Sequence, residues 1–199
     1  METRDHILFT ALMCFIEYGY DRISLNEIIK KTDLTKGAFY YYFSSKDQLV
    51  EDVIETYLFR YVDKCMGTIK LSGITPEEKL KQLPEALLNT KECLITNGEV
   101  DNSKRKSFFI LFLNSLEKSE ELTKRFNRAQ IESIHSITEL IESFQESGYF
   151  KKTYDASETA ELLFAAYRGA MFDWITGLVE DIELELHARI GKFTRILHV

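Results

Sequence analysis

The sequence predicts an all-α protein with two parts, a small N-terminal bundle of three helices and a larger helical domain. Apolar residues recur at three- and four-residue spacing along most of the chain, and no stretch shows the alternation of a half-buried strand. Two prolines and nine glycines in 199 residues leave few positions that would break a helix. We expect the first part to comprise residues 1–47 and the second residues 48–199.

The first two helices have clear start and stop signals. Residues 3–18 carry an apolar stripe of helical spacing, and Gly19 stands where it can end this helix. Ser24 can cap a second helix that ends near Lys31, and Glu27 three residues later completes a capping box. Both helices are therefore delimited by their own sequences.

A short turn separates the second helix from the third. Residues 32–34 break the apolar pattern, and Asp33 tolerates the left-handed conformation better than most residues. Thr35 can then cap a third helix that runs through Tyr42. Two short helices joined by such a turn are typical of a helix-turn-helix motif.

The third helix has two different sides. Phe39 and Phe43 are four residues apart and face the hydrophobic core. Lys36, Tyr40 and Tyr41 project a cation and two hydroxyl-bearing rings away from it. Phosphate oxygens suit these groups, as they suit the backbone N–H groups at capped helix starts. Core packing alone would explain a lone aromatic run, but the caps and the lysine favour an anion site.

Helices are also expected along the rest of the chain. Ser45 and Gln48 can form a capping box at the start of a long helix, in whose first turn Lys46 is easier to explain if an anion docks nearby. Pro84 should bend or shift a later helix, and the polar residues 98–106 separate two others. The expected ranges are 45–69, 76–97, 108–116, 119–147, 156–178 and 181–198.

Composition and charge exclude several classes of protein. The net charge is −7, but residues 1–50 carry six Lys and Arg against seven Asp and Glu, so the acidic surplus lies mainly in the C-terminal part. The three isolated cysteines and four scattered histidines lack metal-ligand spacing, and no nucleotide motif or catalytic constellation occurs. We therefore expect no catalytic residue, metal or cofactor. Without a signal peptide or membrane span, the protein is expected in the cytoplasm and away from membranes.

The motif around the third helix resembles that of the TetR family of transcription regulators. The resemblance covers about residues 4–49 and rests on Ser24, Thr35, Lys36, Gly37, Phe39, Tyr40, Tyr42, Phe43, Ser45 and Lys46. It implies a helix-turn-helix that binds double-stranded operator DNA, and a larger domain that dimerises and binds a small molecule. It also implies a repressor that a ligand releases from a near-palindromic operator.

The outward side of the third helix and the resemblance together predict a set of DNA-binding residues, and the sequence departs from the family pattern at two positions. Asp33 replaces the usual glycine of the turn, and Ala38 stands where a hydroxyl residue is common, so its methyl group could meet a thymine methyl. The expected DNA-binding residues are Ser24, Thr35, Lys36, Gly37, Ala38, Tyr40, Tyr41, Tyr42 and Lys46.

Two further sites are expected in the larger domain. An excess of aromatic residues, together with a few polar ones, predicts a largely apolar ligand pocket, although core packing is the plainer explanation for each ring. The expected pocket residues are Phe108, Phe112, His135, Tyr167, Arg168 and Trp174. Small and apolar residues of the last two helices predict a homodimer interface, made of Ala166, Gly169, Ala170, Ile190, Phe193 and Leu197. The alternative is a helical small-molecule-binding protein or enzyme that does not bind DNA.

Overall fold

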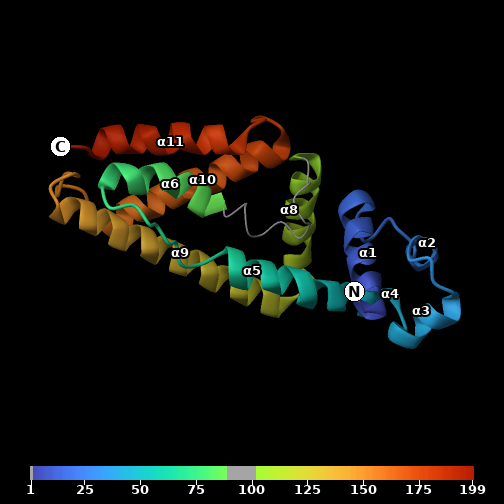
Figure 1. Ribbon diagram of the computed structural model, residues 1–199. Coiled ribbons are helices and arrows are strands. Elements are labelled where there is room, and N and C mark those ends of the chain that lie inside the picture. The colour runs from blue at the N-terminus through green and yellow to red at the C-terminus, as the bar shows by residue number, and fades with distance from the viewer. Residues whose placement is uncertain (1, 89–101) are drawn as a thin grey trace. The chain divides into compact units, whose positions relative to one another are not determined.

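The computed structural model describes residues 2–88 and 102–199 (Figure 1). Within these ranges the chain is helical almost throughout, and its only extended pairing is one isolated bridge between Phe150 and His198. Internal contacts divide the chain into two compact units. As far as these ranges are described, the first unit comprises Met1–Tyr61 and Leu94–Lys124, and the second Val62–Cys93 and Arg125–Val199.

The first unit begins with the three predicted helices, and their bounds agree with the expectation. A fourth helix then passes into a π-helical segment, and a helix from much later in the chain packs against the first. In chain order, the elements of this unit are α1 (Thr3–Tyr18), α2 (Leu25–Lys31), α3 (Lys36–Tyr42), α4 (Lys46–Val53), the π-helix η1 (Ile54–Phe59) and α8 (Asn102–Leu116). The helix α5 (Arg60–Cys65) follows η1 directly.

Side-chain caps fix where the short helices begin. At α2, the Glu27 N–H donates to Ser24 Oγ over 3.3 Å, and the Ser24 N–H donates to the Glu27 carboxylate over 2.8 Å, which confirms the capping box. Thr35 Oγ1 accepts from the Ala38 N–H at 3.2 Å and starts α3. These contacts satisfy backbone groups that a helix start leaves without partners.

The cap of α4 differs in one detail from the expectation. Ser45 Oγ accepts from the Gln48 N–H at 3.1 Å, as expected. The Gln48 side chain, however, accepts from the N–H and the hydroxyl of Ser44, both at 2.9 Å, instead of returning to Ser45. The reciprocal box predicted from Ser45 and Gln48 was therefore wrong in its second half, because Ser44 offers two donors to the same amide oxygen.

The turn between α2 and α3 is held in a left-handed conformation. Asp33 has φ of 57°, the one positive φ of a non-glycine residue in the described ranges. Before it, the buried Thr32 hydroxyl donates to the Ile29 carbonyl over 2.7 Å. The Thr32 carbonyl lies 3.2 Å from His6 Nε2 of α1. The turn is thus tied to both preceding helices, and the conformation expected of Asp33 is confirmed.

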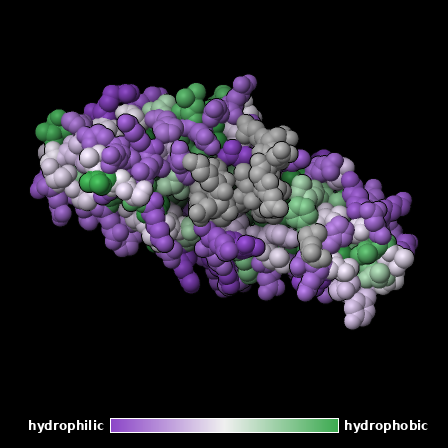
Figure 2. Space-filling view, viewed as in Figure 1, coloured by the Kyte–Doolittle hydropathy of each residue, from purple (hydrophilic) through white to green (hydrophobic). Residues whose placement is uncertain are grey.

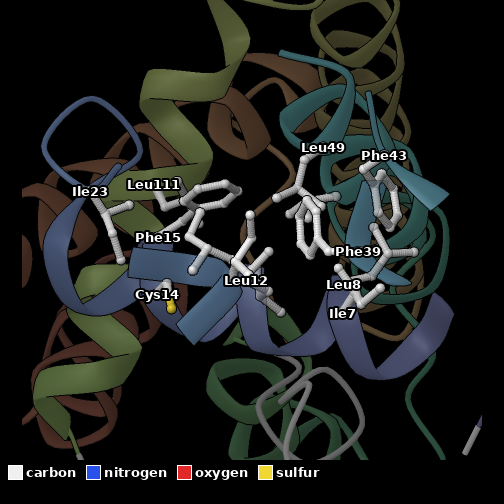
Figure 3. Packing of buried hydrophobic residues seen from close by; sticks show 14 residues of the cluster. Ile7, Leu8, Leu12, Cys14, Phe15, Ile23, Phe39, Phe43, Leu49 and Leu111 are labelled. Atoms are coloured by element: carbon white, nitrogen blue, oxygen red, sulfur yellow. The ribbon is translucent and has the colours of Figure 1, made fainter. Parts of the chain in front are cut away.

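A single hydrophobic cluster holds the first unit together (Figure 3). Phe39 and Phe43 of α3 are fully buried, with ring centroids 5.9 Å apart, as their spacing predicted. They pack with Leu8 and Leu12 of α1, and Leu111 of α8 belongs to the same cluster. The core of the N-terminal helices therefore includes a residue that lies far beyond them in sequence.

The second unit is built from longer helices. Its elements are α6 (Pro76–Leu88), α9 (Glu120–Glu146) from Arg125 onward, α10 (Ala156–Thr176) and α11 (Ile182–Leu197). Helix α11 packs against both α10 and α6. Their core includes Phe144, Phe164 and Ile137. The end of the chain is fixed where the Lys151 N–H donates to the Leu197 carbonyl over 2.8 Å. No helix in the described ranges is both long and apolar enough to cross a membrane.

Several expected bounds differ from the structure. The long fourth helix ends at Cys65 instead of residue 69, and its middle is π-helical. The helix expected from residue 108 begins at Asn102, so polar residues that were assigned to a linker form its first turns. Pro76 opens α6 as expected, while the rest of the range expected for this helix, residues 89–97, lies outside the described residues.

The cap of α2 gives a first prediction. Ser24→Ala should lower the free energy of unfolding by about 1 kcal/mol, because the Glu27 N–H loses its acceptor. Hydrogen bonds from Ser24 hold the pKa of the Glu27 carboxyl below its ordinary value of 4.5. Their stabilisation is therefore present above pH 4.5 and is lost as the pH falls through the lowered pKa. Urea unfolding at several pH values should show a difference between wild type and variant that shrinks below pH 4.5. Asn26→Ala on the same helix is the control, and an equal loss there would contradict the assignment.

The left-handed turn gives a second prediction. Asp33→Gly should raise the free energy of unfolding by about 1 kcal/mol, because glycine adopts a positive φ without a steric cost. Asp33→Asn should stay close to wild type, since asparagine also tolerates this conformation, whereas Asp33→Val should be clearly destabilised. The measurement is urea unfolding of the three variants. A stable valine variant would show that the turn does not require this backbone conformation.

Candidate nucleic-acid interface

Helix α3 presents a polar outer side while its apolar side is held in the core. Lys36 is exposed, and the Tyr40 and Tyr41 side chains are 48% and 82% exposed. Phe39, between these residues, is fully buried. The outward direction predicted for Lys36, Tyr40 and Tyr41 therefore agrees with the structure. An exposed aromatic ring with a hydroxyl group offers both apolar contact and a hydrogen bond to a partner.

The remaining predicted residues of α3 lie in three different environments. Gly37 is exposed, and a Cβ atom placed there would have no neighbour within 4 Å in the described structure. Ala38 is half-buried, and its N–H is used by the Thr35 cap. Tyr42 is also half-buried and packs against the hydrophobic cluster of the first unit. The centre of its ring lies 5.0 Å from that of Tyr41. Only Gly37 of these three offers an open backbone to a partner.

Two lysines, one in α3 and one at the start of α4, carry charges that no carboxylate neutralises in the described part of the chain. Lys36 opens α3, and Lys46, which is half-buried, opens α4. In the described part of the chain, no carboxylate lies within ion-pair distance of either ammonium group. Arg4, by contrast, pairs with Asp52 at 2.8 Å. An anionic partner can therefore meet Lys36 and Lys46 without breaking an ion pair in the described part of the chain.

The six residues expected to line a ligand pocket fall into two groups. Phe108 and Phe112 of α8 belong to the first unit and are buried. His135, Tyr167, Arg168 and Trp174 belong to the second unit. We therefore describe the groups separately.

Within the second unit, the expected pocket residues have different surroundings. The side chain of His135 is 72% exposed and lies 3.9 Å from the Glu139 carboxylate, so it does not lie in an apolar interior. Arg168 is exposed, with its guanidinium 5.4 Å from the Phe164 ring centre. The Tyr167 ring packs on Phe164, and burial raises the pKa of its hydroxyl to about 12. Trp174 is fully buried. His135 thus lies at the surface beside a carboxylate of its own helix.

The residues expected at the dimer interface are largely used within one chain. Ala170, Ile190 and Leu197 are buried, and the last two belong to the core of the second unit. Phe193 is half-buried against the same core. These four side chains therefore leave little surface for a partner, and the expected set needs revision for this physical reason.

Gly169 and Ala166 have a separate role inside the chain. The Arg189 guanidinium donates to the Ala166 carbonyl over 3.2 Å. A Cβ at Gly169 would lie 3.1 Å from the same guanidinium, so the missing side chain gives Arg189 its space. Arg189 also pairs with Asp173 and with Glu185, and these hydrogen bonds raise the pKa of the guanidinium. The small residues thus serve contact between α10 and α11.

An aromatic cluster in the first unit was missed by the sequence analysis. Tyr61 lies in the helix that follows η1, and its ring meets those of Phe108, Phe109 and Phe112 edge-on, with centroids 5.1, 5.9 and 5.3 Å away. In the sequence, Tyr61 appears only as one of many apolar residues of a long helix. The helical spacing of Tyr61 could predict that its ring is buried, but not that it packs against three phenyl rings of α8.

Comparison with known proteins identifies the type of domain. A family model described as bacterial regulatory proteins, tetR family, matches residues 7–53, which contain α1 to α4. The transcriptional repressor DhaR of Mycobacterium sp. (strain GP1) is 23% identical over 171 residues, which make up 84% of this chain and 80% of DhaR. The transcriptional regulator AcrR of Shigella flexneri is 33% identical over 97 residues, which are 48% of this chain and 43% of AcrR.

Solved structures extend the likeness to the whole fold. A TetR transcription regulator from Haloarcula marismortui superposes with a TM-score of 0.68 at 17% identity, covering 99% of this chain and 98% of that one. The reduced form of NemR from Escherichia coli gives a TM-score of 0.59 at 16% identity, covering 100% and 98%. The named relatives are transcription regulators and not enzymes. The described α3 motif, the matched domain and the shared fold together identify the chain as a DNA-binding transcription regulator whose residues 7–53 form a helix-turn-helix domain of the tetR type.

Proposed function

We propose that this regulator is a cytoplasmic repressor that binds a near-palindromic operator as a homodimer and leaves it when a small molecule binds. The observation that carries the DNA-binding part is the outer side of α3, where Lys36, Tyr40 and Tyr41 are exposed while Phe39 fixes the helix from behind. Repression is supported by the names of DhaR and NemR, which are both transcriptional repressors.

The chemistry of α3 suits a DNA backbone. Lysine ammonium groups and tyrosine hydroxyls are common donors to phosphate oxygens. Gly37 adds an exposed stretch of helix backbone near the capped start of α3, where a phosphate can approach the N–H groups closely. Ala38 and Tyr42 are less exposed, so we assign them supporting contacts only. Ser24 and Thr35 act mainly by capping the helices that present these groups.

The exposed sides of α10 and α11 support a dimer formed by a second copy of the chain. On α10, Leu162 and Phe172 are both more than 60% exposed. On α11, Leu184 and Ile196 are also exposed. Hydrophobic patches interrupt the hydrophilic surface along α11 in Figure 2. We therefore place the interface on these exposed residues instead of the buried ones expected from the sequence.

A flat, largely apolar effector is supported by the aromatic residues of α8. Phe108 and Phe112 line one side of the ring cluster that contains Tyr61. Edge-on ring contacts of this kind can be replaced by contacts to an aromatic ligand of similar shape. In the second unit, taken by itself, Tyr167 and Trp174 remain proposed contacts of an apolar ligand and Arg168 a proposed polar contact at the surface, whereas His135 is too exposed to line an apolar pocket.

The DNA interface gives a third prediction. The operator can be selected from genomic DNA with the purified protein, and its affinity measured by electrophoretic shift at several salt concentrations. Lys46→Ala should weaken binding and lower the slope of log affinity against log salt by about one unit, because one phosphate contact is lost. Lys30→Ala, an exposed lysine at the end of α2, is the matched control. Tyr40→Ala should also weaken binding. Unchanged affinity in both the Lys46 and Tyr40 variants would disprove the interface, and failure to select any DNA would disprove the proposed function.

The dimer gives a fourth prediction. Phe172→Glu should convert the protein from a dimer to a monomer at micromolar concentration, because a charge would be buried in an apolar interface. Ile131→Glu on α9 is the control, since Ile131 is 68% exposed and Phe172 is 66% exposed. Size-exclusion chromatography with light scattering measures the mass. A monomeric wild type, or an equal effect of both substitutions, would contradict this interface.

A further inference from the structure

A cavity of about 360 Å³ lies between the end of α1, the loop that follows it and α8. All of its lining residues belong to the first unit. Its volume is at the lower end of the range of small-molecule sites, so a ligand of modest size would fill it. Among the residues that the structure describes, neither those of α3 nor the rings proposed to meet the effector line this cavity. The proposed function therefore leaves it unused.

Helix α8 presents a separate side to the cavity. The lining residues of this helix are Ser107, Ile110, Leu111 and Asn114. Because residues three or four positions apart are neighbours on a helix, these four lie on one side of α8. Phe108 and Phe112 lie on the side whose rings meet Tyr61. The cavity and the ring cluster are therefore two different places on α8.

Hydrogen bonds fix the loop between α1 and α2, which forms one edge of the cavity. Gly19 ends α1 with φ of 79°, and its carbonyl accepts from the N–H groups of Arg22 and Ile23 over 3.3 and 3.4 Å. The Tyr20 hydroxyl donates to the Asn114 carbonyl over 3.3 Å and so joins the loop to α8. This edge is therefore held in place before a ligand binds, which lowers the entropic cost of binding.

Part of the cavity wall is apolar. Phe15 and Leu111 are buried members of the hydrophobic cluster of the first unit (Figure 3), and Ile16 packs against the same cluster. Ile110 of α8 also lines the cavity, and it is 45% exposed. An apolar group that enters the cavity would remove this surface from water. The wall therefore suits a ligand with a hydrophobic body.

The loop and the end of α8 add charged groups. Arg22 is exposed and lines the cavity, and no carboxylate among the described residues lies within ion-pair distance of its guanidinium. The Lys118 ammonium lies 4.3 Å from the Tyr20 ring centre. Burial raises the pKa of the Tyr20 hydroxyl, and of the charges that act on it Lys118 has a larger effect than either Asp21 or Glu117. An anionic group can therefore pair with Arg22 without breaking an ion pair.

We propose that this cavity is a binding site for a small amphipathic monocarboxylate. The hydrophobic body of the ligand lies against Ile16 and Ile110, and its carboxylate pairs with Arg22, which can donate two parallel hydrogen bonds to it. Asp21, which also lines the cavity, disfavours a second negative charge on the ligand. The site belongs to the DNA-binding unit, and binding there requires neither operator nor effector.

Phenylpropionate is the probe, with the uncharged phenylpropanol and the cationic phenylpropylamine as analogues of similar shape. Saturation-transfer NMR on the full-length protein should show saturable binding of the acid, roughly tenfold weaker binding of the alcohol, and still weaker binding of the amine. Arg22→Gln should weaken binding of the acid roughly tenfold and leave that of the alcohol unchanged, because only the acid uses the guanidinium. Arg60→Gln, at an exposed arginine of the same unit outside the cavity, is the matched control.

A second substitution tests the apolar wall. Ile110→Asn should weaken binding of the acid and of the alcohol alike, by about fivefold, because both lose the same apolar contact. Leu113→Asn is the matched control, since Leu113 is 46% exposed on the same helix and does not line the cavity. No saturable binding of the acid, tighter binding of the amine, or equal effects of the matched control substitutions would overturn the proposal.

Hydrogen exchange of the wild type covers the case in which a variant does not fold. With phenylpropionate, amide protection measured by mass spectrometry should increase in peptides that contain residues 15–23 and 107–114 and stay unchanged in the second unit. Increased protection confined to other peptides would overturn the site. This measurement needs no operator, so it distinguishes failure of the site from failure of the proposed function.

Discussion

The burial of Phe39 is the constraint on which the rest of the interface depends. A seven-residue helix is too short to be stable by itself, so its position must come from tertiary packing. Phe39 and Phe43 supply that packing from one side of α3, against α1 and α4 (Figure 3). Because the side chains of a helix are fixed relative to one another, burying these two rings directs Lys36, Tyr40 and Tyr41 outward. The polar surface is thus a consequence of the core behind it.

Much of the N-terminal fold could be predicted from the sequence because its determinants are local. Ser24 and Thr35 begin their helices through contacts that span only three residues, and Asp33 fits a left-handed turn by its own side-chain properties. The faces of α3 follow from helical spacing alone. Such features need no knowledge of distant parts of the chain, and the structure agrees with each of them.

The features that could not be predicted are those imposed by distant contacts. The sequence between Lys46 and Cys65 predicts one long helix but does not show where its π segment lies. Tyr61 could be recognised as buried, but not as the partner of rings some fifty residues later. Likewise, helical spacing on α10 and α11 does not show which apolar residues face the core of the same chain and which face a partner. Ile190 and Leu197 were assigned to the wrong side for this reason.

Leu111 of α8 lies in the hydrophobic cluster of the first unit. The DNA-binding helices therefore cannot be moved to another protein as a module without α8. A fragment that stops after the helix-turn-helix loses the apolar contact that α8 makes with α1, and it leaves that side of Phe15 and Ile23 open to water. A fusion of these DNA-binding helices to another ligand-binding domain must therefore include α8, or the side of α1 that contacts α8 must be redesigned to be polar. The boundary of the DNA-binding part thus follows physical contact and not the order of the chain.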